Sequence, residues 1–168
     1  MSGTHLVVIG ERLALAWVLS EQRMAFPSYR AREVSAVERG DDLLIYTTRG
    51  AWHNPTRDRG RVIAHARVTT PVMPLDPPVE VAGREFALGC GFKLLSLAPF
   101  RDGVELAPLV PELESLPGGN AWAMRLRRPL VTLSDKDAEL LKALLDELAG
   151  SPKRTLPSYL DAVAGVQR

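Results

Sequence analysis

The chain has 168 residues, of which 46% are hydrophobic and 24% charged, and its formal net charge is +1. This length and composition favour one globular domain with a sizeable core and exclude a disordered or collagen-like chain. No stretch approaches the ~20 apolar residues of a membrane span, and the N-terminus lacks a signal-peptide pattern. The single Cys90 excludes an intramolecular disulfide, so we expect a cytoplasmic protein.

The first forty residues predict one strand followed by two helices. The β-branched run 5–9 predicts a short strand that ends at a glycine. Residues 11–24 place apolar side chains at helical spacing, which predicts an amphipathic helix with Trp17 in the core. Pro27 disfavours the α conformation in the residue before it and so interrupts the helical pattern. Residues 30–38 predict a second, shorter helix.

The clearest strands are residues 43–48 and 61–68. In the second, Val62, Ala64, Ala66 and Val68 alternate with mostly polar positions, so one face is expected to be buried. His65 lies on the other face, where a solvent-facing or hydrogen-bonded histidine is more common than a catalytic one. Four prolines between positions 71 and 78 predict an irregular, extended connection.

The second half predicts further strands and a well-marked helix. In chain order, we expect a strand within 84–100, a short helix at 108–116 and a strand at 121–126. Residues 134–149 predict a helix, because Ser134 can cap its start and leucines form a stripe at helical spacing. Residues 151–168 suggest a tail with at most one weak helical turn docked on the body.

These elements do not alternate regularly between strand and helix, so a doubly wound parallel sheet is not expected. They favour an α+β fold, a small curved mixed barrel of about five to six strands with surrounding helices. We expect residues 1–150 to form this domain and residues 151–168 to form its C-terminal tail.

Local motifs of the common enzyme classes are absent from the sequence. The phosphate loop G-x-x-x-x-G-K-[ST], the pair C-x-x-C and the zinc motif H-E-x-x-H do not occur. Cys90 is expected to be a small buried strand residue rather than a nucleophile. We therefore expect no metal, no cofactor and no catalytic activity.

Positive charge is concentrated between positions 49 and 67. This segment holds five arginines and one aspartate, a local charge of +4, so the rest of the chain sums to −3. Two interpretations remain open for this patch. The arginines and Trp52 are either solvated strand-edge residues over a half-buried ring, or a platform for a base and its phosphates. Stacking of one base on an aromatic ring contributes about 1–3 kcal/mol.

Three stretches carry a resemblance to a known family. RMAFPSYRAREVSAVERGDDLLIYTTRG resembles the short helix, Gly-Asp pair, hydrophobic strand and tyrosine of the EVE domain family. GRVIAHARVTTPV is similar to the next strand of that family, and RLRRPLVTLSDKDAELLKALL to its closing arginine-rich strand and final helix. EVE domains belong to the PUA-like superfamily, which also includes YTH and ASCH domains.

The resemblance implies a pseudo-barrel that binds nucleic acid and seats a flipped, modified base in an aromatic pocket. By position, the implied pocket residues are Phe26, Ser28, Tyr29, Thr47, Thr48 and Trp52. The implied phosphate contacts are Arg49, Arg57 and Arg59. Trp52 would wall the flipped base with Tyr29 or Phe26 opposite, and Ser28 and Thr47 would bond its edge.

The leading hypothesis is a monomeric, non-catalytic reader of 5-methylcytosine or a related modified cytosine in DNA. A second hypothesis is an RNA-binding PUA-like module. A third is an ASCH-like hydrolase of modified nucleosides, which would need Lys93, Glu33 and either Tyr46 or Tyr29 in one pocket. A domain used only for protein contacts remains the fourth.

Overall fold

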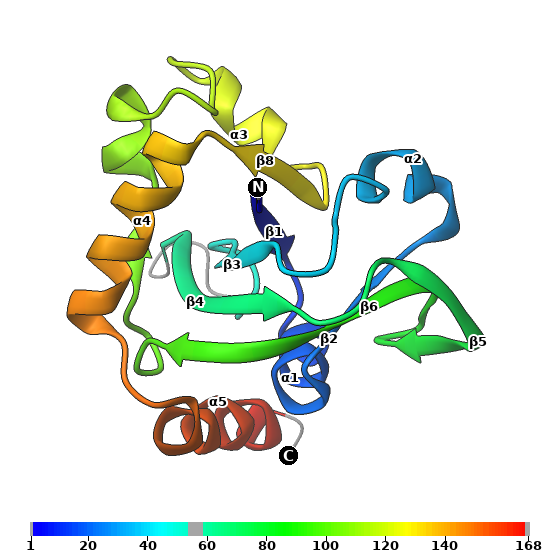
Figure 1. Cartoon of the computed structure of the whole chain (residues 1–168). Helices are drawn as coiled ribbons and strands as arrows, with labels where there is room; N and C mark the ends of the chain where they lie inside the picture. Colours follow the sequence, from blue (N-terminus) through cyan, green and yellow to red (C-terminus); the bar gives the residue numbers. More distant parts are fainter. Residues whose placement is uncertain (1, 54–58, 167–168) are drawn as a thin grey trace.

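A strongly curled sheet forms the centre of the molecule, and helices lie around it (Figure 1). The computed structural model describes residues 2–53 and 59–166. Within them the strand order is β2-β6-β4-β3-β1-β8, with β5 paired to β6 and β7 paired to β4. The predicted α+β class, with a curved mixed sheet and surrounding helices, is confirmed. The predicted count of five to six strands was too low, because eight strands join this sheet.

The strands are β1 (Thr4–Ile9), β2 (Arg23–Phe26), β3 (Asp42–Thr47), β4 (Arg61–Val68), β5 (Met73–Val81), β6 (Arg84–Leu97), β7 (Val104–Glu105) and β8 (Leu130–Leu133). The α-helices are α1 (Arg12–Glu21), α2 (Ala31–Val34), α3 (Ala121–Arg125), α4 (Asp135–Leu148) and α5 (Pro152–Val166). Two 3₁₀ helices are η1 (Ser28–Arg30) and η2 (Ala107–Glu112).

One parallel pair, β1 with β3, lies among antiparallel neighbours. Its register runs from Thr4 opposite Asp42 to Ile9 opposite Thr47, so the carboxyl ends of both strands lie side by side. The long strand β6 pairs with β4 through its second half and with β2 and β5 through its first half. This division of β6 between partners bends the sheet, and the β5–β6 hairpin projects from the body (Figure 1).

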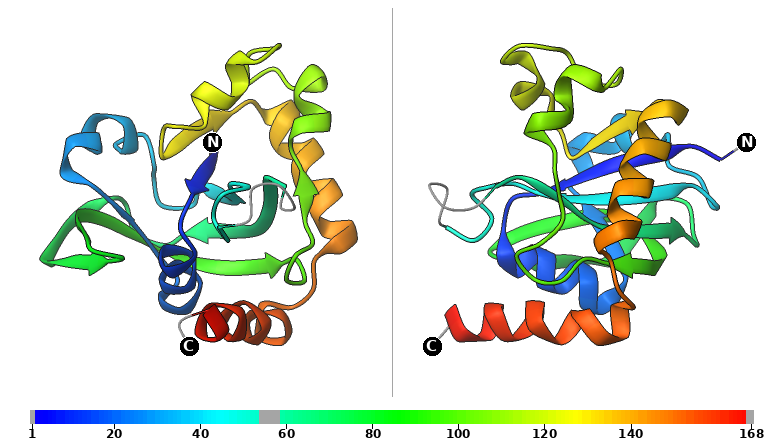
Figure 2. Two further views of the ribbon diagram at one scale, coloured as in Figure 1. Left: turned by 180° about the vertical axis from the view of Figure 1, so that it is seen from behind. Right: turned by 90° about the vertical axis from the view of Figure 1, so that its left-hand side faces the viewer.

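Two apolar cores lie on the two faces of the sheet. Val7 and Ile9 of β1 pack in one core with α1, whereas Leu6 packs in the other with Leu141 of α4. Successive side chains of a strand point to opposite faces, so β1 is buried on both. Figure 2 shows α4 along one side of the sheet and α5 beneath α1.

Several predicted elements are confirmed. The strands at 5–9, 43–48 and 61–68 correspond to β1, β3 and β4, and the four alternating residues of β4 are all buried. The strand expected within 84–100 is β6, and the short helix expected at 108–116 is the 3₁₀ helix η2. Helix α4 begins after Ser134, whose Oγ accepts a hydrogen bond from the Asp137 amide at 3.2 Å. No helix of the described residues combines the length and apolarity needed to cross a bilayer.

Other predictions were wrong. The helix expected over 11–24 ends at Glu21, and residues 23–26 form β2, where Met24 and Phe26 are buried in alternation. Residues 71–78 were expected to form an irregular, extended connection; they are extended, but residues 73–78 belong to the regular strand β5, which among the described residues pairs with β6 alone. Prolines are tolerated on such an edge strand. Residues 121–126 were expected to be a strand but form α3, in keeping with the helix propensity of Ala, Met and Arg.

The C-terminal segment is more ordered than expected. Instead of a tail with one weak turn, it forms the 15-residue helix α5, with Pro152 at its first position, where proline is tolerated. Tyr159 is 2% exposed, and its hydroxyl donates a hydrogen bond to the Ala98 carbonyl at 2.7 Å. Helix α5 therefore packs against the body of the protein.

Candidate functional site

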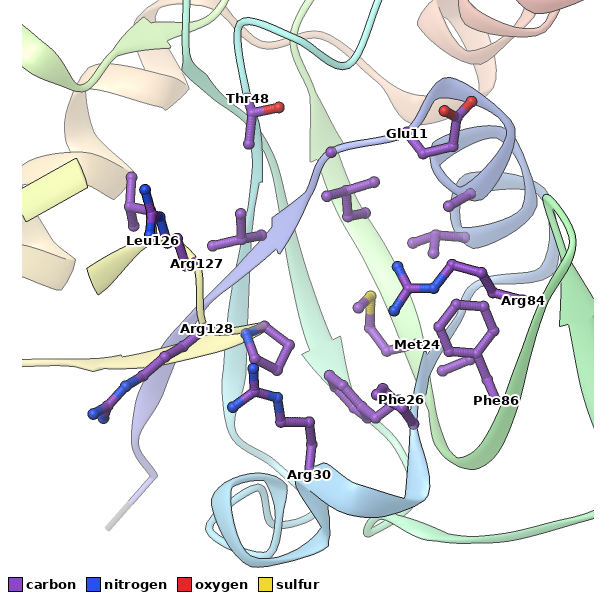
Figure 3. A pocket seen from close by; sticks show the side chains of 18 of the residues that line it. Glu11, Met24, Phe26, Arg30, Thr48, Arg84, Phe86, Leu126, Arg127 and Arg128 are labelled. Carbon is purple, nitrogen blue, oxygen red and sulfur yellow. The ribbon is translucent and has the colours of Figure 1, made fainter. Parts of the chain in front are cut away.

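A cavity of about 380 Å³ opens where β1 ends. Its wall is built by the start of α1, by β2 and η1, by the first residues of β6 and by the loop that leads into β8 (Figure 3). Its volume lies within the range of about 300–1,000 Å³ that is common for ligand sites. We call it the first cavity.

The floor of the first cavity is apolar and fixed. It includes Val18 of α1 with Met24 and Phe26 of β2, all at most 5% exposed. Strand β2 lies against a glycine pair of β6, and a Cβ at Gly89 would come within 2.7 Å of the Met24 carbonyl oxygen. This close approach of two backbones holds the floor in place.

Two aromatic side chains of the cavity wall are more exposed than the floor residues. Phe86 is half-buried, and Tyr29 is 72% exposed. The Arg84 guanidinium lies 5.5 Å from the Phe86 ring centroid, and that of Arg30 lies 5.3 Å from the Tyr29 centroid. Figure 3 shows Arg84 beside Phe86 at one side of the cavity and Arg128 at the other. A planar ligand would find ring faces and guanidinium planes around it.

The rim carries more positive than negative charge. Four arginines line it, Arg30, Arg84, Arg127 and Arg128, against Glu11. Arg30 is engaged by Glu33 at 2.7 Å, and this hydrogen bond raises its pKa. Glu11 accepts a hydrogen bond from the Leu13 amide at 3.2 Å, which caps α1. Within the described part of the chain, no ion pair engages the other three arginines, so they remain available for an anion.

A second cavity, of about 490 Å³, adjoins the first. Thr48, Leu126 and Arg127 line both cavities. The second also has Arg49, Arg59 and the half-buried Trp122 in its wall. The two cavities thus form one surface with arginines along its length.

The predicted site residues are divided between these cavities. Phe26, Tyr29 and Thr48 line the first, and Thr48, Arg49 and Arg59 line the second. Ser28 is exposed at the start of η1 and lines neither. Arg57 lies outside the described residues.

Thr47 and Trp52 lie elsewhere. The Trp52 ring meets Phe100 edge-on, with centroids 4.9 Å apart, and Phe100 meets Tyr159 in the same way. The cavity beside Thr47 and Trp52 has a volume of about 20 Å³. This is space for about one water molecule, not a base. Trp52 packs against the core and lines neither large cavity.

Sequence reasoning missed the residues that the fold brings in from far along the chain. These are Arg84, Phe86, Trp122, Arg127 and Arg128. The arginine-rich run 125–128 is conspicuous in the sequence, but no local pattern predicted that it would lie beside β1. Nothing local singled out Arg84 and Phe86, which reach the cavity only because β6 pairs with β2.

The residues required by the hydrolase hypothesis are not brought together. Tyr29, Tyr46, Glu33 and Lys93 line four different cavities. Burial raises the pKa of the Cys90 thiol to about 11, so it stays protonated near neutral pH. As expected from the sequence, Cys90 is a buried strand residue. No group of three or more His, Cys, Asp or Glu side chains suited to a metal ion occurs among the residues that the structure describes.

No protein-family model and no curated protein matches the sequence. Solved structures do match the fold. The Mmi1 YTH domain, solved in complex with RNA, has a TM-score of 0.60 at 11% identity, with 87% of this chain and 79% of that chain covered. The chain shares the fold of YTH domains.

Two further solved structures share the fold of this chain. The YTH domain of the Zygosaccharomyces rouxii MRB1 protein, in complex with N6-methyladenosine RNA, gives a TM-score of 0.55 at 11% identity, covering 84% of this chain and 86% of that one. Rpa0253 from Rhodopseudomonas palustris gives 0.56 at 16% identity, covering 87% and 94%. At these identities the likeness concerns the fold alone.

Proposed function

We propose that the chain is a non-catalytic nucleic-acid-binding module that seats one modified base in the first cavity. The observation that carries the proposal is the combination of an apolar floor, two aromatic rings and three arginines without ion-pair partners among the described residues. Bases require apolar surfaces and ring faces, and phosphates require cations.

A base can enter such a cavity only after it leaves its stack, which costs a few kcal/mol in a duplex. Contact with Phe86 and with the floor residues Met24 and Phe26 would offset this cost. Burial of one extra methyl carbon contributes about 0.8 kcal/mol, roughly a fourfold preference. Selectivity for a modified base must therefore also come from the shape of the floor and from easier unstacking.

We take 5-methylcytosine in DNA as the first ligand to test, because the sequence motifs resemble those of EVE domains. N6-methyladenosine in RNA is the second, because a YTH domain of the same fold was solved with N6-methyladenosine RNA. Both ligands are bases that carry one added methyl group.

The test is fluorescence anisotropy with labelled DNA and RNA, single- and double-stranded, each with and without the methylated base. We expect the wild-type protein to prefer one methylated form. The variant Gly10→Phe should lose that preference, because Gly10 lines the mouth of the first cavity. A Cβ at Gly10 would lie 3.6 Å from Thr48 Oγ1, an ordinary contact, so the backbone at this position can carry a side chain.

The matched control is Gly118→Phe. Gly118 is exposed, lines neither cavity, and has no atom within 4 Å of an added Cβ. This variant should bind like the wild type. Equal binding of methylated and unmethylated forms at matched salt, in DNA and in RNA, would overturn the proposed function.

A further inference from the structure

The second cavity has the composition of a site for a ring system. Trp122 of α3 forms part of its wall, and the same side chain packs against the core on the α4 face of the sheet. The indole is therefore held in place while part of its surface remains open. Ala107 and Ala123 in the same wall are small and exposed, so they leave room beside the indole.

A buried tyrosine borders this space. The Tyr46 side chain lines the second cavity and is only 4% exposed. Its hydroxyl forms no hydrogen bond with any residue that the structure describes. The hydroxyl oxygen is also not one of the fully enclosed side-chain atoms that lack a hydrogen-bond partner. The hydroxyl lies against Gly60, where an added Cβ would overlap it. Burial raises the pKa of Tyr46 to about 12, so the hydroxyl remains a hydrogen-bond donor at neutral pH.

Cations surround the same space. Arg49 and Arg59 are exposed in its wall, and Arg127 lies between the two cavities because it lines both. The acidic residue of this wall, Glu105, lies 3.6 Å from Arg61, which reduces its effect on the other arginines. An anionic group between the cavities would meet Arg127 first.

We infer that the second cavity holds the base of the nucleotide next to the modified one, with Arg127 at the phosphate that joins the two nucleotides. This inference rests on the proposed function of the first cavity. The neighbouring base would stack on Trp122 and accept a hydrogen bond from the Tyr46 hydroxyl. The protein would thus bind a dinucleotide step rather than a single base.

The shared walls support a ligand that spans both cavities. Adjacent nucleotides are joined through one phosphate, and Thr48, Leu126 and Arg127 form the boundary that this phosphate would cross. Stacking on an aromatic side chain accepts any base, whereas the hydroxyl can favour a base with an acceptor at its edge. A preference for the neighbouring base would therefore come from Tyr46.

The experiment removes the neighbouring base from the ligand. Oligonucleotides carry the preferred methylated base and an abasic position on its 5′ side, on its 3′ side, or on neither. We expect the wild-type protein to lose roughly tenfold in affinity or more when one of these neighbours is abasic, and little when the other is. The variants Trp122→Leu and Tyr46→Phe should bind the intact strand more weakly and lose less on the abasic one.

Controls separate a weakened fold from a lost contact. Trp17 is also half-buried but lines neither cavity, so Trp17→Leu should keep the full response to the abasic position. Tyr46→Phe removes only the hydroxyl, and the wild-type comparison needs no variant at all. Equal binding of all three oligonucleotides by the wild-type protein would overturn the inference.

That failure is distinguishable from failure of the proposed function. If the methylated base is still preferred while abasic neighbours have no effect, the first cavity works alone. If the methylated and unmethylated strands bind equally, the proposed function itself fails.

Discussion

The two ends of the parallel pair β1 and β3 differ in whether their charged side chains have partners within the protein. At the amino ends, Asp41 is buried and Asp42 is half-buried, and both carboxylates have hydrogen-bonding or charged partners. At the carboxyl ends lie two open cavities whose arginines are mostly unengaged within the described residues. In open sheets, ligands commonly bind beyond the carboxyl ends of parallel strands, and the same end is the open one here.

The amino end is a closed network. Asp41 accepts hydrogen bonds from the Gly3 amide at 3.0 Å, the Glu38 amide at 2.9 Å and the His5 ring at 2.8 Å. Asp42 lies 2.7 Å from Lys142 of α4 and 3.2 Å from Arg67. Both carboxylates therefore have partners, as the burial of charge requires.

The difference between the ends separates stability from binding. Charges that are satisfied inside the protein hold the strands in register but offer nothing to a ligand. An arginine without a partner at the surface does not reduce the stability of the fold. It forms its strongest interaction when a phosphate binds. Substitutions at the amino end should therefore change the free energy of unfolding, and substitutions at the carboxyl end should change affinity.

The largest effect is expected for Asp41→Ala. Removal of this carboxylate leaves the His5 ring and two backbone amides without their acceptor. We expect the free energy of unfolding in urea to fall by about 3–5 kcal/mol, while the folded fraction keeps its affinity. Asp146 is exposed on α4, so Asp146→Ala should change stability by less than about 0.5 kcal/mol. If Asp41→Ala lowers the free energy of unfolding by less than about 1 kcal/mol, the hydrogen bonds of Asp41 do not stabilise the amino end of the β1–β3 pair.

Low pH should destabilise the amino end of the β1–β3 pair. Burial acts to raise the pKa of Asp41 and Asp42, but hydrogen bonds and the His5, Lys142 and His65 side chains outweigh it, so both pKa values lie below the ordinary 3.8. Hydrogen bonds likewise lower the pKa of Asp137 in α4. A carboxyl with a lowered folded pKa stabilises fully above its unfolded pKa, and this contribution disappears as pH falls through the folded value.

Thermal unfolding at a series of pH values measures this effect. Burial lowers the pKa of His65, beside Asp42, so the melting temperature should already begin to fall as pH drops below about 6.5. It should fall steeply below about 4, where the carboxyls become protonated. Protonation leaves each side chain in place, so each carboxyl should contribute less than its replacement by alanine. A melting temperature that rises on acidification would contradict the account of the amino end.

At the carboxyl end, the strongest single effect on binding is expected for Phe86→Ala. Loss of this ring removes a stacking surface that contributes about 1–3 kcal/mol of affinity. Met73 lies on the same β5–β6 hairpin, is 46% exposed and lines neither cavity, so Met73→Ala is the matched control. If anisotropy shows the same affinity for both variants, the hairpin does not form a wall of the binding site.

A smaller effect with a distinct signature is expected for Arg128→Ala. Loss of one phosphate contact should weaken binding to methylated and unmethylated strands alike and lower the salt dependence of log K by about 1. Arg154 is exposed on α5 and lines neither cavity, so Arg154→Ala should keep the wild-type slope. An unchanged slope for Arg128→Ala would remove this residue from the phosphate path.

The sequence predicted the class of fold because its strongest patterns are local. The alternation in β4 and the capped leucine stripe of α4 depend only on neighbouring residues, and both are confirmed. Strand β2 was missed because a four-residue strand after a helix carries too short a pattern. The helix α5 was missed because its prolines suggested a tail, although Tyr159 anchors it through a contact 61 residues away.

The site was predictable only in part for the same reason. Phe26, Tyr29 and Thr48 lie in segments close to β1 and β3 and do line the first cavity. Phe86 and Arg127 arrive through long-range pairing that no local pattern encodes. Trp52, the most conspicuous aromatic of the basic segment, packs on Phe100, whose position depends on the chain beyond β6.

The central claim is that a modified base lies on the floor of the first cavity, and Met24 offers a direct probe of it. The sequence has only four methionines, so methyl labelling gives a simple NMR spectrum in which Met24→Leu assigns the floor signal. Ring currents of a seated base should shift the Met24 methyl strongly with a methylated strand and much less with its unmethylated counterpart. The exposed Met73 should not move. An unchanged Met24 signal at saturating ligand would contradict the account.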